Sequence, residues 1–308
     1  MAAADRSNAR RWDTEIVVVG ADATGLVARV TSLLFERGCN IEDLDQDVRD
    51  GVFRMRLHAD TDGMVCKPGT LEEDLLDLGD ELGVDVRVRL ADATGARRTA
   101  LLVTKESHAP RAVLEACADG TLDATVPVMI GNHDDLAPLA EEFDVPFVDV
   151  GDAGGAHDER ELLRVLEEYE ADCLALARFM RILSPEVVFR YEGRIVNVHP
   201  SLLPAYPGAE AYRQAVEGGA RVHGATAHYV TTDLDQGPVI AQRSFPVAPG
   251  DGPEDLKERG RPLESEALVA GLRAHLDDAL VVRRGRTRFR EGVDPDAYDL
   301  GGVAAGGE

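Results

Sequence analysis

The residues best suited to chemistry are Asn197 and His199, in the run NVHPSLLP, and Asp235, further along in the run LDQGP. They supply an amide, an imidazole and a carboxylate. Attack on a carbonyl needs such groups, because an amide and an imidazole can donate to the developing oxyanion while a carboxylate orients or deprotonates the nucleophile. Asn197 and His199 stand at i and i+2 of a predicted strand, so both side chains point to one face and can reach one substrate oxygen.

Each of these residues also has an ordinary structural interpretation. His199 could be a hydrogen-bonded structural histidine, Asn197 could cap a turn, and Asp235 could belong to an acidic turn in a chain rich in aspartate. Spacing alone does not bring Asp235 beside His199. The residue types therefore give a hypothesis about carbonyl chemistry, which the elements around them must support.

Residues 14–91 predict a small α/β domain. Its predicted strands lie at residues 15–19, 40–48, 52–59 and 84–90. Its predicted helices lie at residues 26–35 and 71–82. The resulting order, βαββαβ, is that of the ferredoxin-like split βαβ arrangement.

A linker at 91–96 leads to a second predicted domain, residues 98–290, in which strands and helices alternate. The first strands are expected at 100–103, 125–130, 145–148, 173–177 and 195–198, with helices at 109–118, 136–142, 159–168 and 185–191. Strands at 225–230 and 239–246, a helix at 263–280 and a β end at 281–289 follow. This alternation predicts a doubly wound, mostly parallel sheet, which binds ligands beyond the carboxyl ends of its strands, where Asn197 and His199 lie.

Composition narrows the class of protein. A net charge of −24, from 57 acidic and 33 basic residues, disfavours nucleic-acid binding and is typical of adaptation to high salt.

The polar residues 1–13 are expected to be loose and the glycine-rich residues 301–308 to fray. With no apolar run long enough for a bilayer, no secretory signal and scattered cysteines, we expect a cytoplasmic protein without a metal site.

Four segments together carry a family resemblance: ARFMRILS (177–184), NVHPSLLP (197–204), HGATAH (223–228) and LDQGP (234–238). They resemble the formyltransferase family that uses 10-formyltetrahydrofolate, in the order found there. IGNH (130–133) and a preceding domain similar to an ACT domain, through DATGLV (22–27) and GCNI (38–41), resemble the formyltetrahydrofolate deformylase branch. The resemblance spans residues 14–289, nearly the whole chain.

The resemblance implies hydrolysis of 10-formyltetrahydrofolate to formate and tetrahydrofolate, a reaction that supplies formate for purine synthesis and balances the one-carbon folate pools. Asn197, His199 and Asp235 match the catalytic trio of the family, and no cofactor is implied, since the folate is the substrate. The implied folate-binding residues are Phe179, Met180, Arg181, Ile182 and Leu183. From the residues alone, the apolar members of this segment read as ordinary core.

The ACT resemblance implies a second ligand. Such domains bind amino acids near the turn after the first strand, often across a dimer interface, so Asp22, Gly25, Asn40 and Ile41 are candidates for an effector site. A homo-oligomer formed through this domain is expected. A role in assembly alone is the other reading.

Two other functions stay open. The first is transfer of the formyl group to glycinamide ribonucleotide, which requires a phosphate site, but the stretch after the first strand of the second domain has no glycine and contains Glu106. Lys105 and Ser107 in the same stretch keep this alternative open. The second is a non-catalytic amino-acid sensor, against which the intact trio argues.

Overall fold

A computed structural model describes residues 14–49, 51–61, 63–90, 96–151 and 158–303. The chain forms two compact units that divide between Gly95 and Ala96. The predicted linker, 91–96, spans this division, and its residues 91–95 lie outside the described residues, as do residues 1–13 and 304–308.

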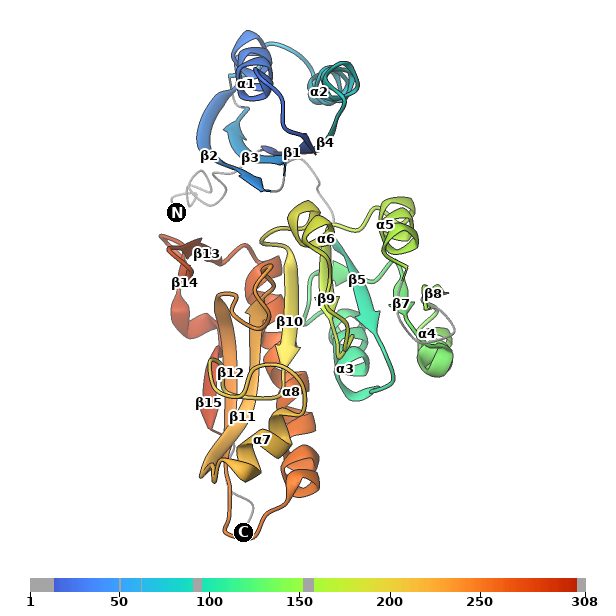
Figure 1. Ribbon diagram of the computed structural model, residues 1–308, viewed down its shortest axis with the longest axis vertical. Helices are drawn as coiled ribbons and strands as arrows, with labels where there is room; N and C mark the ends of the chain where they lie inside the picture. The colour runs from blue at the N-terminus through green and yellow to red at the C-terminus, as the bar shows by residue number, and fades with distance from the viewer. Residues whose placement is uncertain (1–13, 50, 62, 91–95, 152–157, 304–308) are drawn as a thin grey trace, which may run out of the picture. The chain divides into compact units, whose positions relative to one another are not determined.

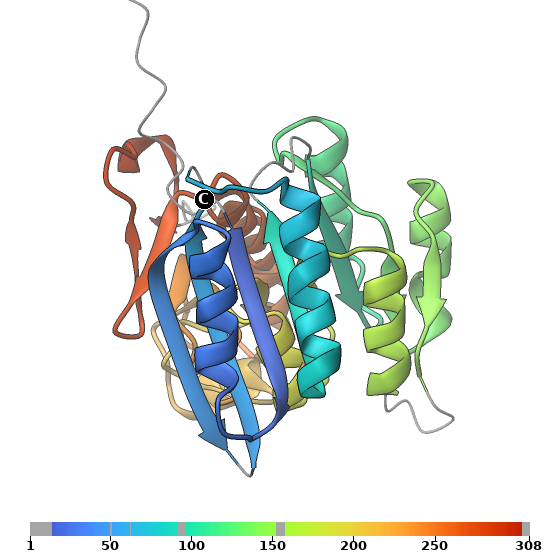
Figure 2. The ribbon, with the colours of Figure 1, turned by 90° about the horizontal axis from the view of Figure 1, so that it is seen from above.

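The first unit has the predicted order βαββαβ. Its elements are β1 (Thr14–Ala21), α1 (Leu26–Glu36), β2 (Asn40–Arg49), β3 (Val52–Asp60), α2 (Pro68–Leu82) and β4 (Val84–Leu90). The strands form an antiparallel sheet in the order β2-β3-β1-β4. Burial alternates along β3, and its inward residues Phe53, Met55 and Leu57 pack with Val30 and Leu34 of α1. Both helices cover one face of this sheet (Figure 2).

The second unit is built on one large sheet. Its first half contains β5 (Arg97–Val103), α3 (His108–Ala118), β6 (Ala124–Thr125), β7 (Met129–Gly131), η1 (Asp134–Leu136), α4 (Ala137–Glu142), β8 (Phe147–Asp149), α5 (Glu159–Glu168), β9 (Cys173–Leu176), α6 (Pro185–Arg190) and β10 (Ile195–His199). Its second half contains α7 (Ala211–Glu217), β11 (Val222–Tyr229), β12 (Val239–Pro246), α8 (Pro253–Leu276), β13 (Leu280–Arg283), β14 (Arg286–Phe289), η2 (Pro295–Ala297) and β15 (Gly301–Val303). Figure 1 shows this order along the chain.

Among the described residues the strands of this sheet run β15-β12-β11-β10-β9-β5-β7-β8, with β6 beside β5. The pairs from β10 to β8 are parallel, and β11 is antiparallel to both of its neighbours. The chain leaves β5 toward β7 and β8 and then returns to its other side with β9. The predicted fold, a mostly parallel doubly wound sheet, is confirmed, and the switch point lies between β5 and β9.

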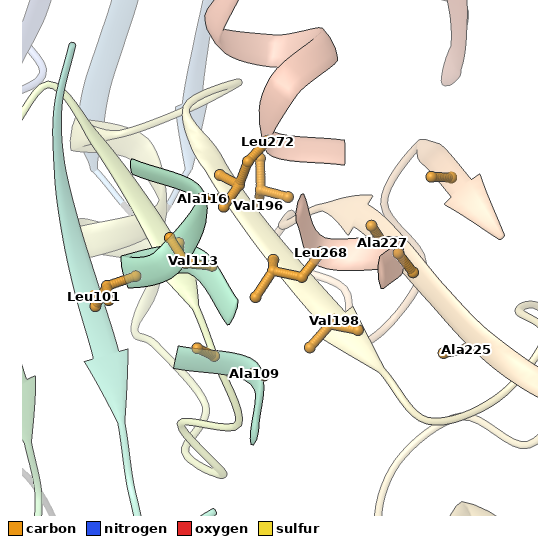
Figure 3. Close-up of a cluster of buried hydrophobic side chains, with 14 of the residues drawn as sticks. Leu101, Ala109, Val113, Ala116, Val196, Val198, Ala225, Ala227, Leu268 and Leu272 are labelled. Carbon is orange, nitrogen blue, oxygen red and sulfur yellow. The ribbon is translucent and has the colours of Figure 1, made fainter. Parts of the chain in front are cut away.

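Apolar side chains fill a layer on each face of the sheet. Leu101 of β5 and Val196 and Val198 of β10 pack on the face covered by α3 and α8, with Val113 and Leu268 (Figure 3). The alternate residues of the same strands pack toward α5 and α6. The sheet is therefore buried on both faces and provides a rigid base for residues at its carboxyl edge.

The structure differs from the sequence prediction near the C-terminus. α8 begins at Pro253 rather than at 263, because the exposed Pro262 and the nearby Gly260 read as breaks although the helix continues through both. The predicted frayed tail is wrong for Gly301–Val303, which pairs with β12 as β15. These elements are held by neighbours distant in sequence.

Candidate active site

Strand β10 places Asn197 and His199 on one face. Val196 and Val198 point into the layer beside α8, so the residues that alternate with them point the other way, as Ile195 does. His199 is the last residue of the strand, and it is buried. The predicted shared direction of the amide and the imidazole follows from the two-residue period of a strand.

Asp235 lies beside His199, with Oδ2 at 3.3 Å from Nδ1, and both side chains are 7% exposed. The backbone N–H of Gly208 donates to the same Oδ2 at 2.7 Å. On the other side of the ring, Nε2–H of His199 donates to the carbonyl of Tyr206 at 2.9 Å. Both ring nitrogens of His199 thus face oxygen acceptors, which hold the ring in one orientation.

His228, on β11, completes the group from the neighbouring strand. It stands opposite Asn197 in the antiparallel register. Its Nδ1–H donates to the carbonyl of Tyr229 at 2.9 Å, so its Nε2 is left to accept from Nδ2 of Asn197 at 3.1 Å. Burial lowers the pKa of His228 and outweighs the opposing effects of Tyr229 and Asp235. A neutral His228 therefore orients the Asn197 amide, leaving the second N–H of Nδ2 for a ligand.

The loop between β11 and β12 carries Asp235 back over these strands. Asp235 has a left-handed backbone, with φ of 53°. Gly237, two residues further along, is required there, since a Cβ would lie 1.7 Å from the carbonyl oxygen of Tyr229. The N–H of Tyr229 donates to Pro238 at 2.9 Å and closes the base of the loop. The LDQGP motif is thus explained as a turn that aims a carboxylate at the face of β10.

Thr226, a residue to which sequence analysis assigned no role, fixes the loop after His199. Its hydroxyl donates to the carbonyl of Ser201 at 2.6 Å and accepts from the N–H of Leu203 at 3.0 Å. Gln242 of β12 donates to both Thr226 and the Leu203 carbonyl at 3.0 Å. The Leu203–Pro204 peptide bond is cis. Thr226 stands opposite His199 in the register of β10 and β11, a pairing that only the structure reveals.

The predicted folate segment divides into inward and outward residues. Phe179 and Leu183 are 1% and 6% exposed and belong to the core beside α5 and α6. Met180 and Ile182 are 55% and 70% exposed, and Arg181 is partly buried. Met180 and Ile182 are thus free to contact a ligand at the carboxyl end of β9, whereas Phe179 and Leu183 anchor the segment.

The four predicted effector residues do not all line one pocket. In the first unit, a cavity of about 470 Å³ is lined by Asp22, Gly25 and neighbouring residues of α1, together with Gln46, Val48 and Phe53. Asn40 and Ile41, at the start of β2, do not line it. The structure therefore associates a cavity with the turn after β1 but separates it from the second predicted segment.

Two kinds of feature are absent from the part of the chain that the structure describes: a metal site and a helix that could span a membrane. Within the described residues, no group of three or more His, Cys, Asp or Glu side chains could hold a metal ion. No helix in the described part of the chain has both the length and the apolar character needed to cross a bilayer.

Comparison with known proteins covers both units. A formyl transferase family model matches residues 97–272 and an ACT domain model matches residues 16–89. Formyltetrahydrofolate deformylases from Bacillus subtilis and Escherichia coli (strain K12) are 35% and 37% identical, over 88% and 86% of this chain and 92% and 94% of their own. The crystal structure of such a deformylase from Pseudomonas syringae has a TM-score of 0.62 at 31% identity, covering 91% of this chain and 94% of that one. By contrast, glycinamide ribonucleotide transformylase 1 from Geobacillus kaustophilus, 36% identical with a TM-score of 0.55, covers 59% of this chain and 99% of its own.

The similarity to deformylases thus includes the first unit as well as the second. The chain belongs to the formyltetrahydrofolate deformylase family. The resemblance inferred from the sequence is confirmed, together with the ACT and formyltransferase folds.

The IGNH segment of this deformylase-family chain has a structural role at the end of β7. A Cβ on Gly131 would lie 2.5 Å from the Phe147 ring, so the position needs glycine. Asn132 is buried, and its Oδ1 lies 2.7 Å from the hydroxyl oxygen of Thr104. The single hydrogen of this hydroxyl is shared between Oδ1 of Asn132 and the carbonyl of Phe179. The segment therefore connects the carboxyl ends of β5, β7 and β9.

Proposed function

We propose that this chain hydrolyses 10-formyltetrahydrofolate to formate and tetrahydrofolate. The observation that carries the proposal is the convergence of Asn197, His199 and Asp235 on one face of β10, with His228 supporting the amide. Deformylases that match this chain over both units support the same reaction. Within the family, such a reaction supplies formate for purine synthesis.

The formyl carbon is an amide-type electrophile, and negative charge collects on its oxygen as water adds. The free N–H of Asn197 and a ring N–H of His199 would donate to that oxygen. Nε2–H of His199 donates to the carbonyl of Tyr206, so we expect it to turn toward the formyl oxygen when the folate binds. Loss of one such donor typically costs about 2.7–4 kcal/mol of barrier.

Asp235 would have two tasks. From its position beside Nδ1 it would stabilise the imidazolium of His199, and its carboxylate would accept a proton from the attacking water, directly or through a second water. Collapse of the tetrahedral intermediate needs a proton on the folate nitrogen, and His199 is the acid in reach. The products are then formate and tetrahydrofolate, with no redox change and no cofactor.

Water, rather than a ribonucleotide amine, is the favoured acceptor. A phosphate-bearing acceptor would be expected at the N-terminus of α3, the first helix after β5. There Glu106 forms ion pairs with Lys257 at 3.2 Å and Arg261 at 2.8 Å. Burial raises the pKa of Glu106, but the ion pairs with Lys257 and Arg261 outweigh this effect and lower its pKa overall. Both cations are therefore already paired with a carboxylate, which disfavours their binding a phosphate. Nζ of the nearby Lys105 lies 3.8 Å from Oδ2 of Asp135, so this cation also has an acidic partner.

Three finer parts of the proposal concern ligands and location. The Phe179–Leu183 segment would contact the folate rings through Met180 and Ile182. An amino-acid effector would bind at the cavity beside Asp22 and Gly25. The first unit would also join copies of the chain into a homo-oligomer. In that assembly, Asn40 and Ile41 would reach the effector only from another copy. The absence of any candidate bilayer helix among the described residues is compatible with our proposal of a cytoplasmic enzyme.

The reaction is tested by measuring formate release from 10-formyltetrahydrofolate in molar KCl, with and without glycinamide ribonucleotide. Formate without the acceptor supports hydrolysis. A formylated product formed only with the acceptor would replace hydrolysis by transfer, and no product in either case would favour a sensor. Calorimetry with glycine and methionine tests the effector site, where absence of both heat and rate change would leave assembly as the role of the first unit.

Asp235→Asn separates chemistry from binding. We expect kcat to fall by about 10²–10⁴-fold, because the variant lacks the proton acceptor, while the Kd for tetrahydrofolate changes little. Asp233→Asn is the matched control, since Asp233 is exposed in the same loop, and it should keep full activity. Equal losses of turnover and affinity in Asp235→Asn would reassign Asp235 to folate binding.

A further inference from the structure

The segment between β9 and α6 has a strained backbone. Arg178 and Met180 both have positive φ, at 66° and 56°. Residues other than glycine in this region cost of order 1–3 kcal/mol each and persist where the surroundings over-determine them. Something must therefore hold residues 178–183, which include the proposed folate contacts.

Several contacts hold this segment from the inside. The Ala177 N–H donates to Leu102 at 3.0 Å, the Thr104 hydroxyl donates to Phe179, and the Ser184 N–H donates to Oε1 of Glu159 at 2.6 Å. These contacts fix the backbone before, at and after the two strained residues. A further contact reaches the Arg178 side chain, whose Nε lies 3.3 Å from Oε2 of Glu264.

Glu264, the partner of Arg178, is unusual because it is an acidic residue whose side chain is almost fully buried. It lies on α8, and its side chain is 1% exposed. Its Oε2 lies 3.1 Å from Nε2 of His108 at the start of α3, and its Oε1 accepts from the Tyr212 hydroxyl on α7. A buried carboxylate is costly unless its oxygens are paired and hydrogen-bonded. Burial raises the pKa of Glu264, but His108, Arg178 and Tyr212 outweigh it and keep the carboxylate charged.

We infer that Glu264 is a positioning residue for folate: by pairing with Arg178 it holds the strained 178–183 segment so that Met180 and Ile182 face the ligand. This inference rests on the proposed function, because it assumes that the segment contacts folate. Glu264, whose side chain is 1% exposed, acts from inside the fold, and removing its charge would release Arg178 and let the segment relax.

The test uses the full-length protein and compares Glu264→Gln, Arg178→Met and the double variant. We expect each single variant to raise KM for 10-formyltetrahydrofolate about tenfold, equivalent to about 1.4 kcal/mol, with kcat within about twofold. The double variant should raise KM no further than either single variant, because both remove one clamp. Kinetics are measured at 25 °C once the Tm of each variant has been shown to lie well above that temperature.

Tyr212→Phe is the matched control. It removes another hydrogen bond to the same carboxylate while leaving Arg178 in place, so we expect a lower Tm with an unchanged KM. If Glu264→Gln likewise lowered Tm without raising KM, Glu264 would be merely structural and the inference would be overturned. Independent effects, giving about a hundredfold rise in KM in the double variant, would also overturn the pairing.

Binding of tetrahydrofolate, measured by calorimetry, keeps this test separate from the test of the reaction. If the wild-type chain binds tetrahydrofolate but releases no formate, hydrolysis is refuted and positioning is judged by Kd, which should rise about tenfold in Glu264→Gln. If Kd is the same in wild type and Glu264→Gln, positioning is refuted whatever the reaction. A wild-type chain that binds no folate refutes both.

Discussion

His223 should make the protein lose stability in mild acid. It is 1% exposed, and its ring packs against Tyr206, Tyr212 and Phe245 at centroid distances of 6.1, 5.2 and 5.9 Å. Neither ring nitrogen has a hydrogen-bond partner within the described residues. Burial lowers the pKa of His223 to about 4, although the Pro200 backbone favours the charged form. Folding therefore requires a neutral ring at this position.

The magnitude follows from the two pKa values. An unfolded histidine has a pKa of about 6.5, so between that value and about 4 the unfolded chain binds a proton that the folded chain does not. Stability is fully present above pH 6.5 and is lost as the pH falls. The loss assigned to His223 is about 2 kcal/mol at pH 5 and about 3 kcal/mol at pH 4. His228, whose pKa is also lowered, contributes in the same direction.

The assay is urea unfolding at constant KCl from pH 4 to pH 8, in wild type and His223→Phe. The difference in unfolding free energy should shift by about 3 kcal/mol in favour of the variant between pH 7 and pH 4, because phenylalanine cannot bind the proton. Carboxylates titrate in both proteins and cancel in this comparison. His133→Gln is the control, because His133 is partly exposed, and it should follow the wild-type profile. A difference that stays constant with pH would refute the reasoning.

Three further predictions concern the site loop, a surface hairpin and the acidic composition. Gly237→Ala should abolish most activity and cost about 1–3 kcal/mol in urea unfolding, since the new Cβ meets the Tyr229 carbonyl; a variant with wild-type kinetics would show that the Asp235 loop tolerates displacement. Arg283 stands opposite Arg286 in the pair of β13 and β14, where two like charges repel each other. Arg283→Glu should therefore raise the unfolding free energy by about 0.5 kcal/mol, and Arg283→Gln should give a smaller rise. A decrease in both variants would contradict the repulsion. Raising KCl from low to molar concentration should stabilise the protein by screening its net charge of −24, and unchanged stability across the series would count against adaptation to salt.

Much of the fold was predictable because its signals are local. The alternation that predicted a strand at 239–246 and the amphipathic pattern at 159–168 correspond to β12 and α5 with the same bounds. α5 begins after Asp158, whose side chain accepts from the Arg160 N–H, a capping signal readable from neighbouring residues. By contrast, β15 is a strand because β12 offers it a partner, which its glycine-rich sequence does not reveal.

The candidate site divides in the same way. Residue types, and the two-residue period of β10, determined that Asn197 and His199 share a face. The neutral state of His228 and the hydrogen bonds of the Thr226 hydroxyl could not be predicted from the sequence, because both depend on partners that are distant along the chain. Glu264 was equally hidden, since a glutamate in a helix of an acidic chain carries no sign of burial. Its partners come from α3, α7 and the turn after β9.

The sequence by itself therefore determined the two folds, the family and the side chains available for chemistry, because periodicity and motifs are properties of short stretches of chain. The tertiary structure decided which of those side chains meet. Asp235 reaches His199 because its loop turns back over the sheet, where Gly237 allows close approach to Tyr229. Such distances depend on how loops close and which groups are buried together, and no spacing along the chain encodes them.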